Sequence, residues 1–272
     1  MIPMTNLIER LQSYMRRSAV SRYEAIPVPP FTVFIHPFDA LIYLNYAIPD
    51  GPILGDVREP LRRLRAEFQK KGRVPRFEYV SELAPALADT LLAAGFRQEA
   101  EARLMVCTRE SFTPVAVPEG PVLSVLTSGS PREEVRTFCT TARRGFSPDE
   151  PYEATEEDVS KMLEDLREGR AVLGRVEGQP AMVGMFTPPS EGIAELGGVA
   201  TIERFRKRGL GTALTSRVAQ EAFERGVEVL FLSTISEEAG RIYERVGFRF
   251  VTRMLFMVEG SHPEGAMLPV PG

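Results

Sequence analysis

The chain has 272 residues, of which 43% are hydrophobic and 26% are charged, and its net charge at pH 7 is −4. At about 150 residues per domain, this length fits one large domain or two small ones. The composition excludes a mainly disordered, collagen-like or disulfide-scaffold protein, and the acidic balance argues against a globally basic nucleic-acid binder.

Cysteine and histidine are too sparse to build a metal centre. The chain contains two cysteines, Cys107 and Cys139, and two histidines, His36 and His262. Neither cysteine belongs to a CxxC pair, and neither histidine has neighbours at the spacing of zinc ligands. We therefore expect no metal, and two unlinked thiols in a reducing, cytoplasmic compartment.

The N-terminal segment predicts an amphipathic helix that packs on the body of the protein. It lacks the apolar run of a signal peptide, and its apolar side chains recur at helical spacing at Leu7, Ile8, Leu11, Tyr14 and Met15. The most apolar stretch, residues 31–48, contains His36, Pro37 and Asp39, which is inconsistent with a membrane span. We therefore expect no membrane partner.

A proline-rich stretch, residues 111–121, separates two more regular parts of the chain. Such a stretch is typical of a linker or an extended connection. We predict an N-terminal domain over residues 1–112, a linker over 113–121, a second domain over 122–260 and a tail over 261–272.

In the second part, helical and strand patterns alternate, which predicts a mixed α/β sheet. The expected helices span residues 131–144, 155–168, 210–225 and 237–246, and the expected strands span 171–176, 181–187, 193–201, 227–233 and 248–258. Ser130 is the expected N-cap of the first helix, and Thr155 opens a capping box with Asp158 for the second. Gly226 stands where a C-cap glycine is expected.

Part of this pattern occurs twice. Sliding the chain so that Gly95-Phe96-Arg97 lies on Gly247-Phe248-Arg249 also places Ser81 on Ser233 and Met105-Val106 on Met257-Val258. The identities cluster at a helix exit and along the following strand, which indicates a repeated strand–helix–Gly-Phe–strand unit. Coincidence between two common strand–helix–strand pieces is the alternative.

The most informative run leads from a strand through a basic turn into a helix. After residues 193–201 comes Arg206-Lys207-Arg208-Gly209-Leu210-Gly211-Thr212. Gly209 and Gly211 carry no Cβ that would keep a ligand from the backbone, and the first amides of a helix point outward at the positive end of its dipole. That arrangement binds diphosphate, although a basic helix start with structural glycines is the alternative. The run matches neither GxxxxGKS/T nor GxGxxG.

The run from Arg206 to Gly211 resembles the acyl-CoA-binding motif of the GNAT N-acetyltransferase superfamily, which is Arg or Gln, then x-x-Gly-x, then Gly or Ala. Residues 236–248 resemble the family's closing motif, Asn-x-x-Ala-x-x-Leu-Tyr-x-x-x-Gly-Phe, with Ser236 in place of Asn. The resemblance covers residues 122–258 well and the first part weakly. It implies an α/β (α+β) fold, a mixed and mostly antiparallel sheet flanked by helices, in two GNAT-like units in tandem.

By position, the resemblance implies the residues that contact coenzyme A. The strand before the loop would bond the pantetheine amides through its backbone, and the loop amides would hold the diphosphate. The implied residues are Val199, Ala200, Thr201, Arg206, Lys207, Arg208, Gly209, Leu210, Gly211, Thr212 and Ser236. Gly197-Gly198 indicates either a bulge that opens this strand from its neighbour or plain conformational relief.

The resemblance also implies two catalytic side chains. Tyr243 stands where family members place a hydroxyl beside the CoA sulfur, which makes it the expected general acid; a core tyrosine is the alternative. Glu195 matches a general-base position, and strand alternation predicts that it shares one side with Val199 and Thr201; a solvated strand-edge carboxylate is the alternative. The base position that relatives use on the next strand is Phe231 here. The Val199 N–H would polarise the thioester carbonyl.

The implied function is transfer of an acetyl group from acetyl-CoA, as co-substrate, to a primary amine by direct attack in a ternary complex. The amine belongs to a small molecule or a peptide. A non-catalytic acyl-CoA sensor is the alternative, and a third is an acyltransferase for aminoacyl or long-chain donors. Residues 149–168 are strongly acidic, which would attract a cationic amine or form a solvated helix face.

The first part lacks the residues of this site. The repeat places Leu54, Val57 and Glu59 where the loop has Arg206, Gly209 and Gly211, and Leu91 where the second part has Tyr243. We therefore predict a degenerate GNAT-like unit that keeps the fold and packs on the catalytic half. The sequence does not predict the oligomeric state.

Overall fold

A computed structural model describes residues 4–53, 55–148 and 151–260. These residues form two compact units: the first combines the described residues up to Leu104 with residues 251–260, and the second comprises the described residues between Met105 and Phe250. Two strands, β5 (Phe96–Thr108) and β11 (Arg249–Glu259), contribute residues to both units. The predicted tail over 261–272 lies outside the described residues.

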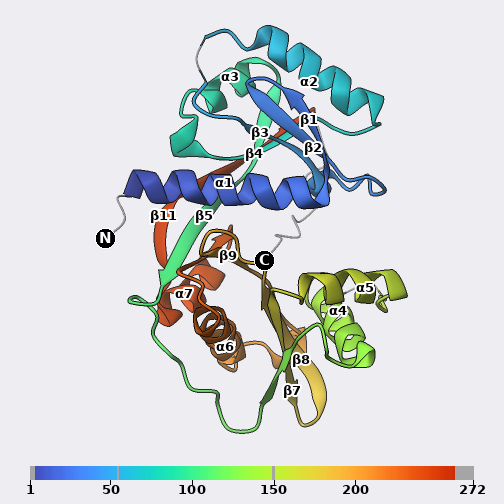
Figure 1. Cartoon of the computed structure of the whole chain (residues 1–272), viewed down its shortest axis with the longest axis vertical. Coiled ribbons are helices and arrows are strands. Elements are labelled where there is room, and N and C mark those ends of the chain that lie inside the picture. Colours follow the sequence, from blue (N-terminus) through green and yellow to red (C-terminus); the bar gives the residue numbers. More distant parts are fainter. Residues whose placement is uncertain (1–3, 54, 149–150, 261–272) are drawn as a thin grey trace. The chain divides into compact units, whose positions relative to one another are not determined.

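The first unit is a sheet with helices packed on it (Figure 1). Its elements are α1 (Met4–Arg22), β1 (Glu24–Val28), β2 (Phe31–Ile35), η1 (Ile42–Leu44), β3 (Asn45–Pro49), α2 (Arg58–Lys70), β4 (Arg76–Val80), η2 (Ser81–Leu83) and α3 (Leu87–Ala93), with parts of β5 and β11. The strand order is β1-β2-β3-β4-β11, antiparallel except for the β3–β4 pair. Helix α2 buries Leu61, Leu64 and Phe68 in the core of this unit.

The predicted N-terminal helix is confirmed as α1. Its apolar face buries Leu7, Ile8, Leu11 and Tyr14, because these residues recur every third or fourth position and so lie on one side of a helix. Over the described residues, no helix of the protein is both long and apolar enough to cross a membrane.

The second unit places helices on both faces of its sheet (Figure 1). Its elements are β6 (Val122–Leu126), α4 (Arg132–Phe146), α5 (Glu156–Asp165), β7 (Arg170–Val176), β8 (Gln179–Phe186), β9 (Ile193–Thr201), η3 (Glu203–Phe205), α6 (Leu210–Glu224), β10 (Val229–Thr234) and α7 (Glu237–Val246). The strand order is β10-β9-β8-β7-β6, antiparallel except for the β9–β10 pair. The predicted α/β class with a mixed, mostly antiparallel sheet is confirmed.

Two sheet faces give the second unit two apolar cores. Helices α4 and α5 cover one face through a cluster that includes Phe138, Val159 and Val183. Helix α6 covers the other face with Leu214 and Val218, where Met182 and Leu196 point from the strands. Successive side chains of one strand thus pack in opposite cores, because they point to opposite faces of the sheet.

The predicted repeat is confirmed at the level of secondary structure. A strand, a helix, a glycine and a further strand occur as β4–α3–β5 and again as β10–α7–β11. Gly95 follows α3 with a φ of +91°, and Gly247 follows α7 with a φ of +105°. A Cβ at Gly247 would lie 2.0 Å from the carbonyl oxygen of Ser111, so only glycine fits there.

Helix caps were predicted with mixed success. Thr155 and Asp158 form the expected capping box of α5. The expected N-cap of α4 at Ser130 is wrong: Pro131 is the N-cap, and the Ser130 hydroxyl accepts a hydrogen bond from the Thr127 N–H at 2.9 Å. A serine that closes its own preceding turn is not available to cap the helix.

The proline-rich stretch before β6 contains no helix or strand among the described residues, but it is fixed to the second unit. The Thr113 N–H donates to the carbonyl of Val246 at 2.9 Å, and the Val115 N–H donates to the Ser216 hydroxyl at 2.8 Å. The ring of Phe112 packs against Phe223 at 5.3 Å. The stretch therefore lies along α6 and the end of α7.

Candidate active site

Strand β9 separates from its parallel neighbour partway along its length. The pairing with β10 joins residues 193–195 to 229–231 and ends with Glu195 opposite Phe231. β9 continues to Thr201, and no residue of β10 in the described chain pairs with that continuation. The backbone groups on this edge of β9 are therefore not used by β10.

A bulge in β9 coincides with the separation. β8 pairs Met185 with Gly197 and Val183 with Ala200, so β9 carries one more residue than β8 between these pairs. Gly198 has a φ of +63°, a left-handed conformation that glycine adopts without steric cost. The bulge predicted at Gly197-Gly198 is thus confirmed.

The same bulge makes the predicted side-chain alternation wrong. Gly197 and Ala200 face one way, because their partners in β8 are two residues apart. Ala200 lies in the core beneath α4 and α5, so Glu195, two residues before Gly197, faces that side as well. Val199 packs on the α6 side, as does Met182, the partner of Thr201. One extra residue therefore separates Glu195 from Val199 and Thr201.

The first turn of α6 presents uncapped amides. Gly209 is its N-cap, with a φ of +76°, and no side chain caps the helix. Within the described residues, no hydrogen bond is found from the N–H groups of Leu210, Gly211 and Thr212. Lys207 is also left-handed, with a φ of +61°. By contrast, the Ser236 hydroxyl caps α7 by accepting from the Ala239 N–H at 3.2 Å.

Arg206 connects this loop to two other elements. Its Nε donates to the carbonyl of Thr201 at 3.0 Å, and its Nη2 donates to the carbonyl of Gly145, in α4, at 2.9 Å. The end of α4 lies close to β9 here, because a Cβ at Gly145 would be 2.7 Å from the Cβ of Ala200. The guanidinium of Arg206 is therefore used in hydrogen bonds that join the end of β9 to the end of α4. Arg208 lies to the side, where it donates to the carbonyl of Arg204 at 3.2 Å.

These elements surround a cavity of about 750 Å³ in the second unit. The sequence-predicted residues that line it are Val199, Ala200, Thr201, Arg206, Lys207, Gly209, Leu210, Gly211, Thr212, Ser236 and Tyr243. Residues that line it but were not predicted are Gly145, Phe146, Phe205, Glu238, Ala239, Arg241, Ile242 and Arg245. Arg208 and Glu195 are not among the lining residues. The cavity thus combines the separated strand, the uncapped helix end and one phenol.

The phenol belongs to Tyr243, which is only 8% exposed. Its ring packs edge-on against Phe248 at 5.9 Å between centroids. Burial raises the pKa of Tyr243 to about 12, because the phenolate is poorly solvated there. The side chain is therefore a neutral proton donor throughout the neutral pH range.

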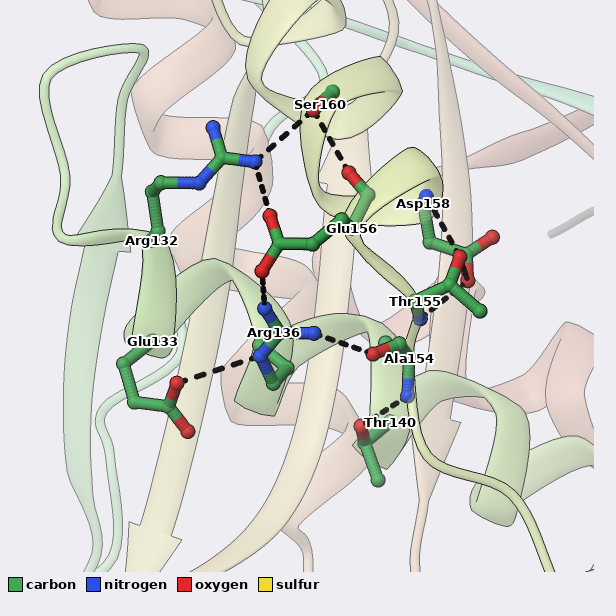
Figure 2. Close-up of polar contacts among 9 residues, drawn as sticks. All are labelled: Arg132, Glu133, Arg136, Thr140, Ala154, Thr155, Glu156, Asp158 and Ser160. Atoms are coloured by element: carbon green, nitrogen blue, oxygen red, sulfur yellow. Dashed lines mark hydrogen bonds and ion pairs between the residues drawn. The ribbon is translucent and has the colours of Figure 1, made fainter.

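The acidic segment 149–168 is partly neutralised from α4. Figure 2 shows Arg132 and Arg136 on either side of the Glu156 carboxylate, with Arg132 at 2.6 Å. The hydrogen bond from Arg132 lowers the pKa of Glu156. The Asp158 carboxylate accepts the Thr155 N–H at 2.8 Å within the capping box. Residues 149–150 lie outside the described residues. Fewer carboxylates of this segment are therefore available to attract a cationic amine than its composition indicates.

Neither cysteine is arranged for nucleophilic chemistry. Cys107 and Cys139 are both free thiols. Burial raises the pKa of each to about 11, so both stay protonated near neutrality. Among the described residues, no group of three or more His, Cys, Asp or Glu side chains is placed to hold a metal ion.

Most of the unpredicted lining residues lie within stretches that the motifs cover. Arg241 and Arg245 stand at the variable positions of the closing motif, and helical spacing alone places them one turn apart. Gly145 and Phe146 end α4, more than fifty residues before the loop. No local signal in the sequence connects them to it, because the contact depends on tertiary packing.

Comparison with known proteins identifies a family whose model matches most of the second unit. The model of the acetyltransferase (GNAT) family matches residues 134–248. No curated protein matches the sequence. The solved structure of a GCN5-related N-acetyltransferase from Kribbella flavida has a TM-score of 0.80 at 24% identity, covering 94% of this chain and 96% of that one.

Two further solved structures are similar at lower identity. A GCN5-related N-acetyltransferase from Sphaerobacter thermophilus has a TM-score of 0.61 at 16% identity, covering 86% of this chain and 78% of that one. A tandem GNAT protein from the clavulanic acid biosynthesis pathway has a TM-score of 0.60 at 17% identity, covering 86% and 79%. At these identities the likeness concerns the fold. Residues 134–248 thus match the acetyltransferase (GNAT) family, and the fold over most of the chain's length is similar to that of solved GCN5-related and tandem GNAT structures.

Proposed function

We propose that the second unit binds an acyl-CoA, in the first place acetyl-CoA, and transfers the acyl group to a primary amine. The observation that carries this proposal is the content of one cavity of about 750 Å³. Uncapped amides, an unpaired strand edge and a protonated phenol line the same space. These are the groups that a diphosphate, a pantetheine chain and a departing thiolate respectively require.

The diphosphate lies at the start of α6 in this proposal. The N–H groups of Leu210, Gly211 and Thr212 have no partner within the described chain, and the positive end of the helix dipole lies behind them. Gly209 lets the chain turn into the helix without a Cβ at its mouth. Amides in this arrangement bind phosphate oxygens with no further charge required.

The pantetheine lies along the free edge of β9. Val199 and Thr201 supply N–H and C=O groups that β10 does not use, and Ala200 lies between them. An extended amide chain in this position would replace a neighbouring strand, since its own amides pair with those of β9. The N–H of Val199 is then close to the thioester carbonyl, where it stabilises the negative charge that develops on oxygen.

The transfer itself forms one bond and breaks another. The neutral amine attacks the thioester carbon, the C–S bond breaks, and the sulfur leaves as a thiolate that takes a proton from the Tyr243 hydroxyl. The proton that the amine loses passes to Glu195, directly or through water, and re-protonates the phenol by way of solvent. Glu195 faces the α4 and α5 side of β9, so the acceptor amine would approach from that side.

The first unit lacks a matching site in this proposal. Its helix α2, which corresponds to α6 by the order of elements, has Val57 as its N-cap with a φ of −106°, where α6 has the left-handed Gly209. Leu91 occupies the position that Tyr243 takes in the second unit, and it is fully buried. The first unit would therefore contribute its fold and its surface, but no bound acyl-CoA.

The experiment is an assay of CoA release from acetyl-CoA with a panel of small-molecule amines and peptides with a free α-amino group. The proposal predicts amine-dependent release of free thiol together with formation of an N-acetyl product, identified by mass spectrometry. Binding of acetyl-CoA with no turnover across the panel would instead indicate an acyl-CoA sensor. Absence of binding would contradict the proposal outright.

A further inference from the structure

Besides Arg206, whose guanidinium donates to backbone carbonyls, three cationic side chains line the cavity near the amides of α6. Arg241 and Arg245 lie on α7, and Lys207 lies in the loop before α6. Residues four apart on a helix are neighbours on its surface, one turn of about 5.4 Å apart along the axis. The two guanidinium groups therefore extend from one stripe of α7 toward the same space.

Within the described part of the chain, these three side chains are unpaired, unlike those of Arg206 and Arg208 in the same loop. Over the described residues, no hydrogen bond or ion pair is found for the side chains of Lys207, Arg241 or Arg245. Arg206 and Arg208, in the same loop, both donate to backbone carbonyls. All three unpaired side chains are solvent-exposed, so their charge is available to a ligand in the cavity.

The cationic stripe is adjacent to the diphosphate position but distinct from it. A Cβ at Gly211, in the first turn of α6, would lie 3.6 Å from the Cδ1 of Ile242. The first turn of α6 thus packs against the turn of α7 that carries Arg241. One cavity therefore holds two anion-binding sets, amides on α6 and cationic side chains on α7 with Lys207 between the elements.

We propose that Lys207, Arg241 and Arg245 bind a second phosphate of the same ligand, the 3′-phosphate of coenzyme A. This inference rests on the proposed function, which places the diphosphate at α6. Guanidinium groups bind phosphate through paired, charge-assisted hydrogen bonds, and a terminal phosphate monoester carries more charge than either phosphate of the diphosphate. The site therefore selects coenzyme A over 3′-dephospho-CoA, and over a pantetheine arm that carries a single phosphate on a carrier protein.

The test is calorimetric titration with coenzyme A and with 3′-dephospho-CoA. The wild-type protein is expected to bind coenzyme A about 10- to 100-fold more tightly, the range that one charge-assisted hydrogen bond gives, because solvent screens the exposed Arg241 and Arg245. In the double variant R241Q/R245Q that preference should disappear, while the affinity for 3′-dephospho-CoA stays at the wild-type value. The unchanged affinity shows at the same time that the variant is folded.

A matched control removes the same charge elsewhere in the second unit. Lys161 on α5 and Arg225 at the end of α6 are exposed and outside the cavity, so K161Q/R225Q should keep the full preference for coenzyme A. Equal binding of the two ligands by the wild-type protein would overturn this inference and leave the proposed function intact. So would a preference that survives in R241Q/R245Q. Failure of the wild-type protein to bind either ligand would overturn the proposed function and this inference with it.

Discussion

At the scale of single residues, the account depends most on Tyr243. Its phenol is buried, lines the cavity and has a pKa raised to about 12. We predict that Y243F lowers kcat by about 10²-fold or more, because the variant removes the proton donor, with no change in the affinity for acetyl-CoA. Stopped assays and calorimetry on the same preparation separate the two quantities.

The control for Y243F is Y79F in the first unit. The Tyr79 hydroxyl is also buried, and within the described residues it has no hydrogen-bond partner. Its loss should leave kcat unchanged. Because a pKa near 12 keeps Tyr243 protonated, kcat/KM of the wild-type protein should show no loss from phenol ionisation between pH 7 and pH 10. A tyrosine-dependent fall in that interval, or full activity in Y243F, contradicts the assigned role.

Glu195 carries a second prediction at this scale. If it accepts the proton of the attacking amine, E195Q lowers kcat/KM at pH 7 by about 10²-fold. The deficit should shrink as the pH rises toward the pKa of the acceptor, because more of the amine is then already deprotonated. The control is E177Q, at the exposed β7–β8 turn. A loss in E195Q that is the same at every pH would assign the residue a structural role.

The sequence predicted the positions and contacts of individual side chains less completely than it predicted the helices and strands. Gly209, Tyr243 and Thr201 line the cavity. The sequence predicted these residues because the spacing of the motifs fixes their positions in the loop, the helix and the strand. The engagement of Arg206 with the carbonyl of Gly145 was not predictable, since it depends on the approach of α4 to β9. The side on which Glu195 lies was predicted wrongly, because a single bulged residue reverses a period of two.

At the scale of elements, the bulge in β9 is the feature that opens the sheet. Gly198 holds a φ of +63° at the extra residue. We predict that G198A lowers the free energy of unfolding by about 1 kcal/mol, the usual cost of a left-handed alanine, and weakens acetyl-CoA binding by shifting the edge of β9. Urea denaturation gives the first quantity and calorimetry the second.

The comparison variant for the bulge is G211A. Gly211 has no left-handed φ, and a Cβ there meets Ile242 at an ordinary 3.6 Å. G211A should therefore unfold at nearly the wild-type urea concentration. If G198A and G211A are equally stable, the bulge does not depend on glycine, and the structural reason given for the open strand edge is wrong.

Elements were predicted well where periodicity and caps agree. Helix α5 begins at its predicted capping box, α7 has the predicted span of Glu237–Val246, and α6 ends before the predicted Gly226. Helix α4 begins one residue late because the hydroxyl of Ser130 is used by the preceding turn. The short-range patterns thus determine which elements form, whereas competition between local hydrogen bonds determines the last residue or two.

At the scale of the whole molecule, one motif-bearing unit accompanies one that repeats its strand–helix–strand pattern without the motif. The repeat was visible in the sequence, because a glycine after a helix and the strand that follows allow few substitutions. The composition of each unit was not visible. Strand β11 follows α7 in sequence, yet its residues from Val251 to Glu259 belong to the first unit. Only three-dimensional contacts reveal that the end of this strand belongs to a different unit from the helix before it.

The central claim is that the amides at the start of α6 hold the diphosphate of an acyl-CoA. The most direct measurement is a titration of the isotope-labelled protein with coenzyme A, followed through backbone amide resonances. We predict that the N–H signals of Gly209, Leu210, Gly211 and Thr212 shift most, and that they saturate at one equivalent per chain. Binding that leaves these four amides unmoved, or saturation at two equivalents, would contradict the account.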